Sequence, residues 1–390
     1  MAERIFTGWE HASIEEALQL CRDTVEDPEL PTLRSWRNQG GRVLGHFQVY
    51  FPEEIAHAAG MLPFKVKGFP VEPTHADSHF GSYLCSILKT SLEVAISGHL
   101  ELDMFVTHPI CDAARNLGAI WGRNFKYPCE ILYLPQNPNS SHSITYLREE
   151  YERLRQSVGA VSASGKAPDD ASLRASIGLF NENRRLLREL YRLKRDTPWL
   201  ISAEDAYCLV ALGGMIPREE HNEFLAFVLS QLPHRTAHKQ DRVRVVFEGG
   251  FCEQPPLDLV RMLGRTCYIV DDDFLIGLRY LTHPVGERGD PLHQLARAYL
   301  QASSYSPVQH DLTKRKDDML VKRIREAKGE AAIVCAAKMC EPGLEEQVAY
   351  ADRLDKEGIP YFISEFEENM TSFEHLELQV ETFLENLMFA

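Results

Sequence analysis

The stretch GEAAIVCAAKMCEPGLEEQVAYADRLDKEGIPYFISEFE, residues 329–367, decides the fold. Residues 330–336 are a short apolar run rich in Ala, Ile and Val, which is typical of a buried parallel strand. Pro342 suits the first turn of a helix, apolar residues then recur at helical spacing, and Gly358 ends that helix. Residues 359–364 are predicted to form the next strand. The stretch therefore predicts a strand, a helix and a second strand.

Cys340 lies between the first of these strands and the helix. Open α/β sheets place ligands beyond the carboxyl ends of their strands, and the N–H groups that begin a helix favour anions. A thiolate is therefore stabilised at this position, where it is a nucleophile or a metal ligand.

Length and composition narrow the class of protein. A chain of 390 residues suggests two or three domains, and 44% hydrophobic residues are enough to fill their cores. The net charge of -15 argues against a general nucleic-acid binder. The first 18 residues are polar and acidic, and no run of about 18 apolar residues occurs, so we expect a cytoplasmic protein with no membrane partner. Nine scattered cysteines without a CxxC suit reduced thiols better than a disulfide framework.

Strands and helices alternate on both sides of a helical middle section. Alternation is predicted up to about residue 134, amphipathic helices over 144–232, and alternation again from Arg242, with a closing helix over 373–387. Residues 28–41, PELPTLRSWRNQGG, are predicted to be a polar lead-in punctuated by Pro and Gly. We therefore expect an α/β protein with two Rossmann-like parallel-sheet domains and a helical section between them. The expected divisions are 1–140, 141–238 and 239–390.

Cys85, Cys111 and Cys340 share a feature that most of the other cysteines lack, because each is predicted within about one turn of the start of a helix. Any one of them alone could be a buried structural thiol. Three with the same placement weaken that interpretation. Three thiolates from separate segments fit a cluster with three cysteine ligands and one iron left open.

Five motifs carry a resemblance to a known family. In order and spacing the chain resembles the 2-hydroxyacyl-CoA dehydratase and benzoyl-CoA reductase subunits, and it looks most like the C-type subunit of the ATP-dependent, dearomatising reductases. The resemblance covers nearly the whole chain, and its last motif is the most specific. The motifs are YFPEEIAHAAGMLPFKVKG, SYLCSILK, HPICDAARNLGAIWG, VDDDFLIGLRY and KMCEPGLEEQVAYADRLDKEGIPYFISEFEEN.

The resemblance implies a cofactor and partners. The family's cluster cysteines fall on Cys85, Cys111 and Cys340, which implies one 4Fe-4S cluster between the two halves. It also implies a paralogous cluster-bearing subunit, ferredoxin as the electron donor, and actin-like activator subunits that bind ATP and Mg. The chain itself has no phosphate-binding loop, which agrees with ATP binding elsewhere.

The implied activity is reduction of benzoyl-CoA, an aromatic acyl-CoA, to a cyclic dienoyl-CoA. Three alternatives stay open. The first is a 2-hydroxyacyl-CoA dehydratase subunit with the same cluster, and the second is an electron-relaying subunit whose cluster never meets substrate. The third is a scaffold that binds zinc.

The remaining cysteines are weaker candidates. Cys335 could pair with Cys340 as CxxxxC, but its place within AAIVCAA favours the core of a strand. Cys129 is predicted to be packed at a strand. Cys252 follows two glycines after a strand and is a weak crevice candidate.

Other polar residues have both functional and structural interpretations. His108 is predicted as a proton donor near the cluster, with loop histidines as alternatives. The acidic residues 271–273 could bind a divalent metal, but capping at a strand end is favoured and we assign them none. The alternative histidines are His75, His79 and His283, and the basic residues that either meet CoA phosphates or form a solvated helix face are Arg115, Arg123 and Lys126.

Overall fold

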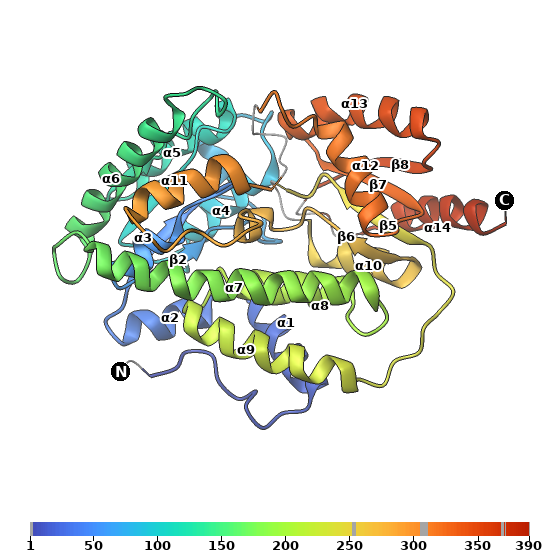
Figure 1. Ribbon diagram of the computed structural model, residues 1–390, viewed down its shortest axis with the longest axis horizontal. Coiled ribbons are helices and arrows are strands. Elements are labelled where there is room, and N and C mark those ends of the chain that lie inside the picture. The colour runs from blue at the N-terminus through green and yellow to red at the C-terminus, as the bar shows by residue number, and fades with distance from the viewer. Residues whose placement is uncertain (1–2, 252–254, 305–310, 368–369, 371, 390) are drawn as a thin grey trace.

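The computed structural model describes residues 3–251, 255–304, 311–367, 370 and 372–389 (Figure 1). Its strands form two separate four-stranded sheets in which every neighbouring pair is parallel. The predicted α/β class with two parallel sheets is therefore confirmed.

The first sheet has the order β2-β1-β3-β4. In its centre, Leu44 pairs with Pro63 on one side and with Met104 on the other. The first two strands are almost wholly buried, as expected when helices cover both faces of a parallel sheet. The strands are β1 (Arg42–His46), β2 (Met61–Lys65), β3 (Met104–Thr107) and β4 (Cys129–Ile131).

The second sheet has the order β6-β5-β7-β8, which repeats the plan of the first. In both sheets the strand order reverses between the first and the third strand along the chain. Ligands bind in α/β sheets at such a reversal, beyond the carboxyl ends of the strands. The strands are β5 (Arg244–Glu248), β6 (Tyr268–Asp271), β7 (Ala331–Ala337) and β8 (Tyr361–Phe366).

Helices account for most of the remaining secondary structure. In the described part of the chain, no helix combines the length and the apolar character needed to cross a bilayer. Short 3-10 turns occur at Ala76–Ser78, Leu232–His234 and η3 (Ile276–Arg279). The α-helices are α1 (Ile14–Glu26), α2 (Pro31–Asn38), α3 (Glu53–Ala58), α4 (Ser86–Ile96), α5 (Asp112–Asn124), α6 (Ser143–Val161), α7 (Asp170–Asp196), α8 (Ala203–Leu212), α9 (Arg218–Gln231), α10 (Leu257–Thr266), α11 (Pro291–Ala302), α12 (Lys316–Glu326), α13 (Glu341–Glu357) and α14 (Glu374–Met388).

Within residues 28–41, predicted only as a polar lead-in, the structure has the helix α2. Pro31 occupies its first turn, where the missing N–H costs nothing, and Thr32 and Leu33 are buried. A helix of eight residues with so few apolar positions gives a weak periodic signal, and its stability comes from packing.

The helix α7 joins the two halves (Figure 1). Its 27 residues carry an apolar stripe, and it packs against α3 beside the first sheet and against β6 of the second. The later helix α11 returns to the first half and packs against α6. The division of the chain at residues 140 and 238 stays a prediction.

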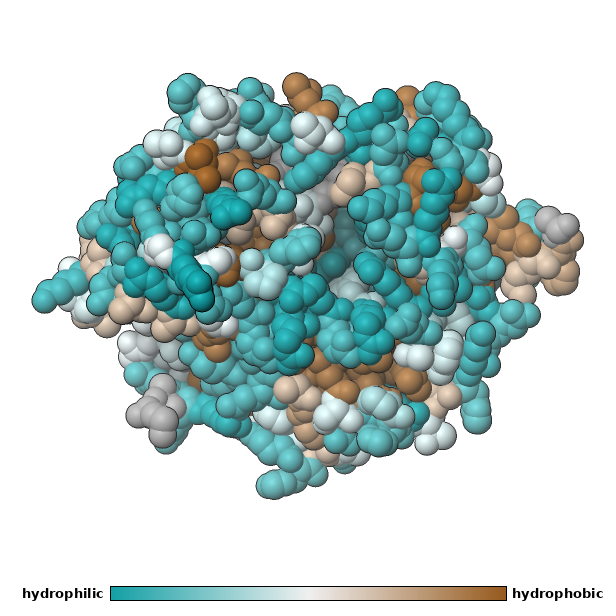
Figure 2. Space-filling model, in the orientation of Figure 1, coloured by the Kyte–Doolittle hydropathy of each residue, from teal (hydrophilic) through white to brown (hydrophobic). Residues whose placement is uncertain are grey.

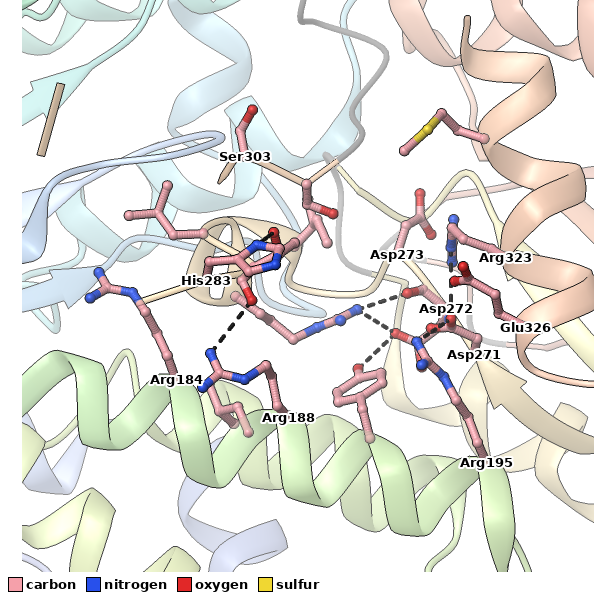
Figure 3. Close-up of a pocket in the computed structure, with 18 of the residues that line it drawn as sticks. Arg184, Arg188, Arg195, Asp271, Asp272, Asp273, His283, Ser303, Arg323 and Glu326 are labelled. Carbon is pink, nitrogen blue, oxygen red and sulfur yellow. Dashed lines mark hydrogen bonds and ion pairs between the residues drawn. The ribbon is translucent and has the colours of Figure 1, made fainter. Parts of the chain in front are cut away.

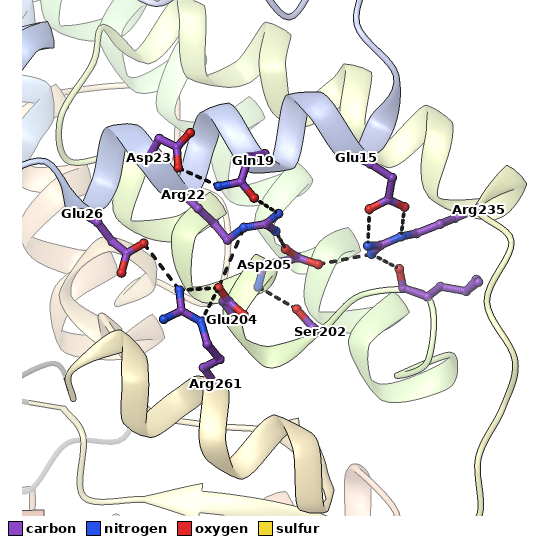
Figure 4. A network of polar contacts seen from close by, with 11 residues as sticks. Glu15, Gln19, Arg22, Asp23, Glu26, Ser202, Glu204, Asp205, Arg235 and Arg261 are labelled. Atoms are coloured by element: carbon purple, nitrogen blue, oxygen red, sulfur yellow. Dashed lines mark hydrogen bonds and ion pairs between the residues drawn. The ribbon is translucent and has the colours of Figure 1, made fainter. Parts of the chain in front are cut away.

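A network of ion pairs ties α1, α8 and α10 together (Figure 4). Its centre is the buried carboxylate of Asp205, which pairs with Arg22 of α1 and, at 3.2 Å, with Arg235. Arg261 of α10 pairs with Glu204 of α8 at 2.8 Å. The helical section is therefore fixed to the second half by charged as well as apolar contacts.

Candidate functional site

Three cysteines occupy N-cap positions, immediately before the first residue of a helix. Cys85 precedes α4, Cys111 precedes α5 and Cys340 precedes α13. The prediction that each lies within one turn of a helix start is therefore confirmed. Because the first N–H groups of a helix have no partner within it, each sulfur lies where negative charge is favoured.

Two of these cysteines follow equivalent strands of the two sheets. Cys111 comes after β3 and Cys340 comes after β7, and both strands border the reversal of strand order in their sheet. Each half of the chain thus presents one thiol at the position where α/β sheets bind ligands.

The electrostatic surroundings of Cys111 relate these two thiols. Burial raises the pKa of the half-buried Cys111 thiol, while the N–H of Ala114, 3.4 Å from Sγ, opposes that effect. The Cys340 thiol raises the pKa of Cys111 further. The two thiols, which come from opposite halves of the chain, therefore lie within electrostatic reach of each other.

Cys340 is buried, with an exposed fraction of 4%. Gly343, in the first turn of α13, leaves space beside its sulfur. A Cβ at Gly343 would lie 3.4 Å from Cys340 Sγ and 3.5 Å from a ring carbon of Phe251. Met339 reaches the N-cap through a left-handed conformation, with φ of 63°, that costs free energy in a residue other than glycine.

Cys85 is half-buried and begins a helix that packs against α5, so Cys85 and Cys111 head adjacent helices. Across the described ranges, no three His, Cys, Asp or Glu side chains form a site for a single metal ion. A polynuclear cluster holds its thiolates further apart than a single ion does, since each thiolate binds a different iron. The donor set fits such a cluster in type, and the convergence of all three thiols stays a prediction.

The other candidate cysteines are packed. Cys335 is buried within β7, and burial raises the pKa of its thiol, which confirms its prediction as strand core. Cys129 begins β4, its Sγ donates to the carbonyl of Gly118 at 3.1 Å, and burial raises its pKa to about 11. Cys252 lies outside the described residues.

The three consecutive aspartates after Val270 are buried and paired. Asp271 accepts from Arg195 at 2.8 Å, Asp272 forms ion pairs with Lys194 and Arg279, and Asp273 accepts from the N–H groups that follow β5. Their carboxylates are therefore bound within the protein.

His108 follows β3 and is fully buried. Its Nδ1 lies 3.1 Å from the carbonyl of Leu132, which assigns the proton to Nδ1. Burial lowers the pKa of His108 to about 3, so the imidazole is neutral. Its role as a proton donor stays a prediction.

The other histidines and the basic residues considered as proton donors or phosphate contacts have polar partners within the protein or are exposed to solvent. His75 pairs with Glu93 at 2.7 Å, and Arg115 pairs with Asp112 on the exposed face of α5. His79 is exposed, and His283 contacts the hydroxyl of Thr282 at 2.9 Å. Arg123 is exposed in the last turn of α5, and Lys126, which follows that helix, is exposed as well.

Sequence analysis missed a buried polar cluster at the carboxyl end of β1. His46 stacks on Phe51 at 4.9 Å, and its Nε2 lies 3.4 Å from Glu53, which pairs with Arg218 at 2.9 Å. Burial lowers the pKa of His46 to about 4. The signal was present in the run HFQVYFPEE, where polar residues interrupt an apolar strand.

The chain matches one protein family and several known proteins over most of its length. Residues 48–387 match the family model described as 2-hydroxyglutaryl-CoA dehydratase, D-component. The chain is 34% identical to the C-type subunit of benzoyl-CoA reductase from Thauera aromatica, over 96% of this chain and 99% of that protein. It is 24% identical to the (R)-phenyllactyl-CoA dehydratase beta subunit of Clostridium sporogenes, over 94% and 97%. It is also 24% identical to the beta subunit of lactoyl-CoA dehydratase from Anaerotignum propionicum, over 96% and 99%.

Proposed function

Since the chain belongs to the 2-hydroxyglutaryl-CoA dehydratase D-component family, we propose that it is the iron-sulfur subunit of an ATP-dependent benzoyl-CoA reductase. The observation that carries the proposal is the 34% identity to the C-type reductase subunit over nearly the full length, against 24% for the two dehydratase subunits. The complex reduces benzoyl-CoA to a cyclic dienoyl-CoA with electrons from reduced ferredoxin.

In this proposal Cys85, Cys111 and Cys340 hold one 4Fe-4S cluster between the two halves. The cluster, when bound, supplies an electron of low potential to the acyl-CoA. The chain holds the three thiolates at helix N-termini, where their negative charge is stabilised. Burial of Cys340 excludes water from one side, and Gly343 keeps the space beside its sulfur open.

His108 is the residue we propose for proton transfer. With Nδ1–H bound to the carbonyl of Leu132, Nε2 carries the free electron pair, and it has no hydrogen-bond partner among the described residues. Because its pKa is lowered to about 3, His108 does not store a proton at neutral pH. It takes up a proton at Nε2 and passes it on, as a relay.

The partners belong to the proposal as well. The relatives are named as C or beta subunits of larger enzymes. We propose a paralogous cluster-bearing subunit, actin-like activator subunits that bind ATP and Mg, and ferredoxin, all in the cytoplasm.

The proposal is tested by assembling the complete complex without oxygen and supplying benzoyl-CoA or a 2-hydroxyacyl-CoA. We expect loss of benzoyl-CoA, formation of a dienoyl-CoA and oxidation of ferredoxin in proportion. Loss of water from the 2-hydroxyacyl-CoA with no net oxidation of ferredoxin would instead identify a dehydratase subunit. If a substrate-bound structure shows the acyl group only at the partner's cluster, this chain is an electron-relaying subunit.

A further inference from the structure

A cationic pocket lies between α7, α12 and the segment that follows β6, away from the three cysteines in sequence (Figure 3). Its volume is about 460 Å³, within the range of roughly 300–1,000 Å³ that is typical of small-molecule sites. Figure 2 shows the same face of the molecule as largely hydrophilic and hollowed near its middle. Six of the lining residues are arginine or lysine: Arg184, Arg188, Arg195, Arg279, Lys322 and Arg323.

The helix α7 supplies three of these cations from a single face. Arg184, Arg188 and Arg195 lie at positions i, i+4 and i+11, and Tyr191 at i+7 completes the stripe. Figure 3 shows the three arginines rising from α7 toward the pocket. The rigid helix therefore fixes where their charges lie.

Three of the four lining carboxylates already have partners within the protein. Asp271 pairs with Arg195, Asp272 with Arg279 and with Lys194, and Asp273 accepts two backbone N–H groups. The ion pairs offset much of the negative charge of Asp271 and Asp272, so these two side chains repel an anion less than free carboxylates would.

Arg188 differs from the other lining arginines, since Arg184 pairs with Glu54 and Arg323 pairs with Glu248. It forms no ion pair within the described residues, and its only described hydrogen bond is a long one, 3.5 Å, to the carbonyl of Thr282. Burial lowers the pKa of Arg188, and the like charges of Arg184 and Arg185 lower it further. Lys322 is exposed, and its one ion pair among the described residues is a long one, 3.8 Å, to the exposed Glu326. The mouth of the pocket therefore carries unneutralised positive charge.

The geometry points to a binding site for a phosphate-bearing ligand, with Arg188 and Lys322 as the residues that contact phosphate. Arginine suits phosphate because its planar guanidinium donates two parallel hydrogen bonds. Two sources share this chemistry, the phosphates of a CoA thioester and those of a free nucleotide. CoA as the source rests on the proposed function, whereas phosphate binding itself does not.

The test measures binding by the full-length chain, purified without oxygen, with calorimetry at low ionic strength. The probes are CoA, adenosine 3′,5′-bisphosphate, ADP, inorganic pyrophosphate and pantetheine, which has no phosphate. The variant is Arg188→Ala, and the matched control is Arg185→Ala, which removes an exposed arginine of α7 that pairs with Glu182 at 2.7 Å. Iron content is measured in each protein.

We expect CoA and adenosine 3′,5′-bisphosphate to bind and pantetheine not to bind. Arg188→Ala weakens both by about tenfold or more, because a charge-assisted hydrogen bond is lost, while Arg185→Ala leaves them unchanged. Binding of ADP and pyrophosphate as tight as that of CoA, with the same loss in Arg188→Ala, supports the phosphate site and makes a free nucleotide its source.

The inference is overturned if Arg188→Ala binds CoA as tightly as the unmodified chain does, or if Arg185→Ala loses as much affinity. Iron content separates this outcome from failure of the proposed function. If the chain binds phosphate but never holds iron, the inference about the pocket stands and the proposed cluster fails. If the chain holds iron but binds no phosphate, only the inference about the pocket fails.

Discussion

A cysteine is an unusual residue at the N-cap of a helix, because its sulfur is a weak hydrogen-bond acceptor. Elsewhere in this chain Ser13, Asp169 and Ser202 fill that position, and each accepts a hydrogen bond from the first turn. Of the three capping cysteines, only Cys111 is described as accepting such a bond, at 3.4 Å. Helix stability alone therefore does not explain three cysteines at N-caps, whereas the proposed ligation of a cluster would.

The placement of these cysteines was predictable because the local signals are strong. Pro342 and Gly358 mark the ends of α13, and an apolar run marks β7. The closeness of Cys340 to Cys111 was not predictable from the residues themselves. It depends on how two sheets lie relative to each other, and it was indicated only by the shared placement of the cysteines at helix starts and by the family resemblance.

The buried histidines predict how stability depends on pH. Burial lowers the pKa of His221 to about 3, helped by Arg218, while an unfolded histidine titrates near about 6.5. Below about pH 6.5 the unfolded chain binds a proton that the folded chain does not, so the stability contributed by His221 is present above that pH and is lost as the pH falls. From pH 6.5 to 4 the loss is about 3 kcal/mol for this residue alone.

His221→Gln tests this effect, since a glutamine amide can replace the hydrogen bonds to Leu209 and Asn183. We measure the unfolding free energy by denaturant titration at several pH values between 6.5 and 4, and its slope against pH gives the number of protons taken up on unfolding. We expect that number to be lower by up to one proton in His221→Gln. The control His293→Gln removes an exposed histidine and leaves the slope unchanged. Equal slopes for His221→Gln and the unmodified chain would contradict neutral burial.

At the scale of elements, α7 and the Asp205 network hold the two halves in a fixed relation. The long helix was predicted from its periodic apolar residues over 173–194, and the structure extends it to Asp170–Asp196. The pocket beside it was not predicted, since its walls come from α7, α12 and the segment after β6, which are far apart in sequence. The spacing of Arg184, Arg188 and Arg195 on one helical face was the one local signal.

Asp205→Ala should lower the free energy of unfolding by about 3 kcal/mol, because it leaves the half-buried guanidinium groups of Arg22 and Arg235 without this partner. The control is Asp258→Ala. This carboxylate pairs with Arg261 of the same network but is 71% exposed, so its loss costs less than about 1 kcal/mol. Chemical denaturation of the reduced, metal-free chain measures both. A loss below about 1 kcal/mol for Asp205→Ala would show that apolar packing alone joins these helices.

At the scale of the whole molecule, the repeated strand order accounts for the site. Both sheets place their first and third strands side by side, and a cysteine follows the third strand in each. In the proposed site, two halves that face each other through these ends bring two thiols to one crevice. The third thiol, Cys85, comes from a helix that packs beside α5 in the first half. Neither half alone supplies all three.

The most direct test of this account is the iron content per chain after reconstitution without oxygen, compared among single variants. We predict about four irons per chain for the unmodified protein and for Cys335→Ala, in which a buried strand residue is replaced. Cys85→Ala, Cys111→Ala and Cys340→Ala should each lose most of the iron while the far-ultraviolet circular dichroism stays unchanged. Full iron content in any one of these three variants would contradict a shared cluster held by all three thiols.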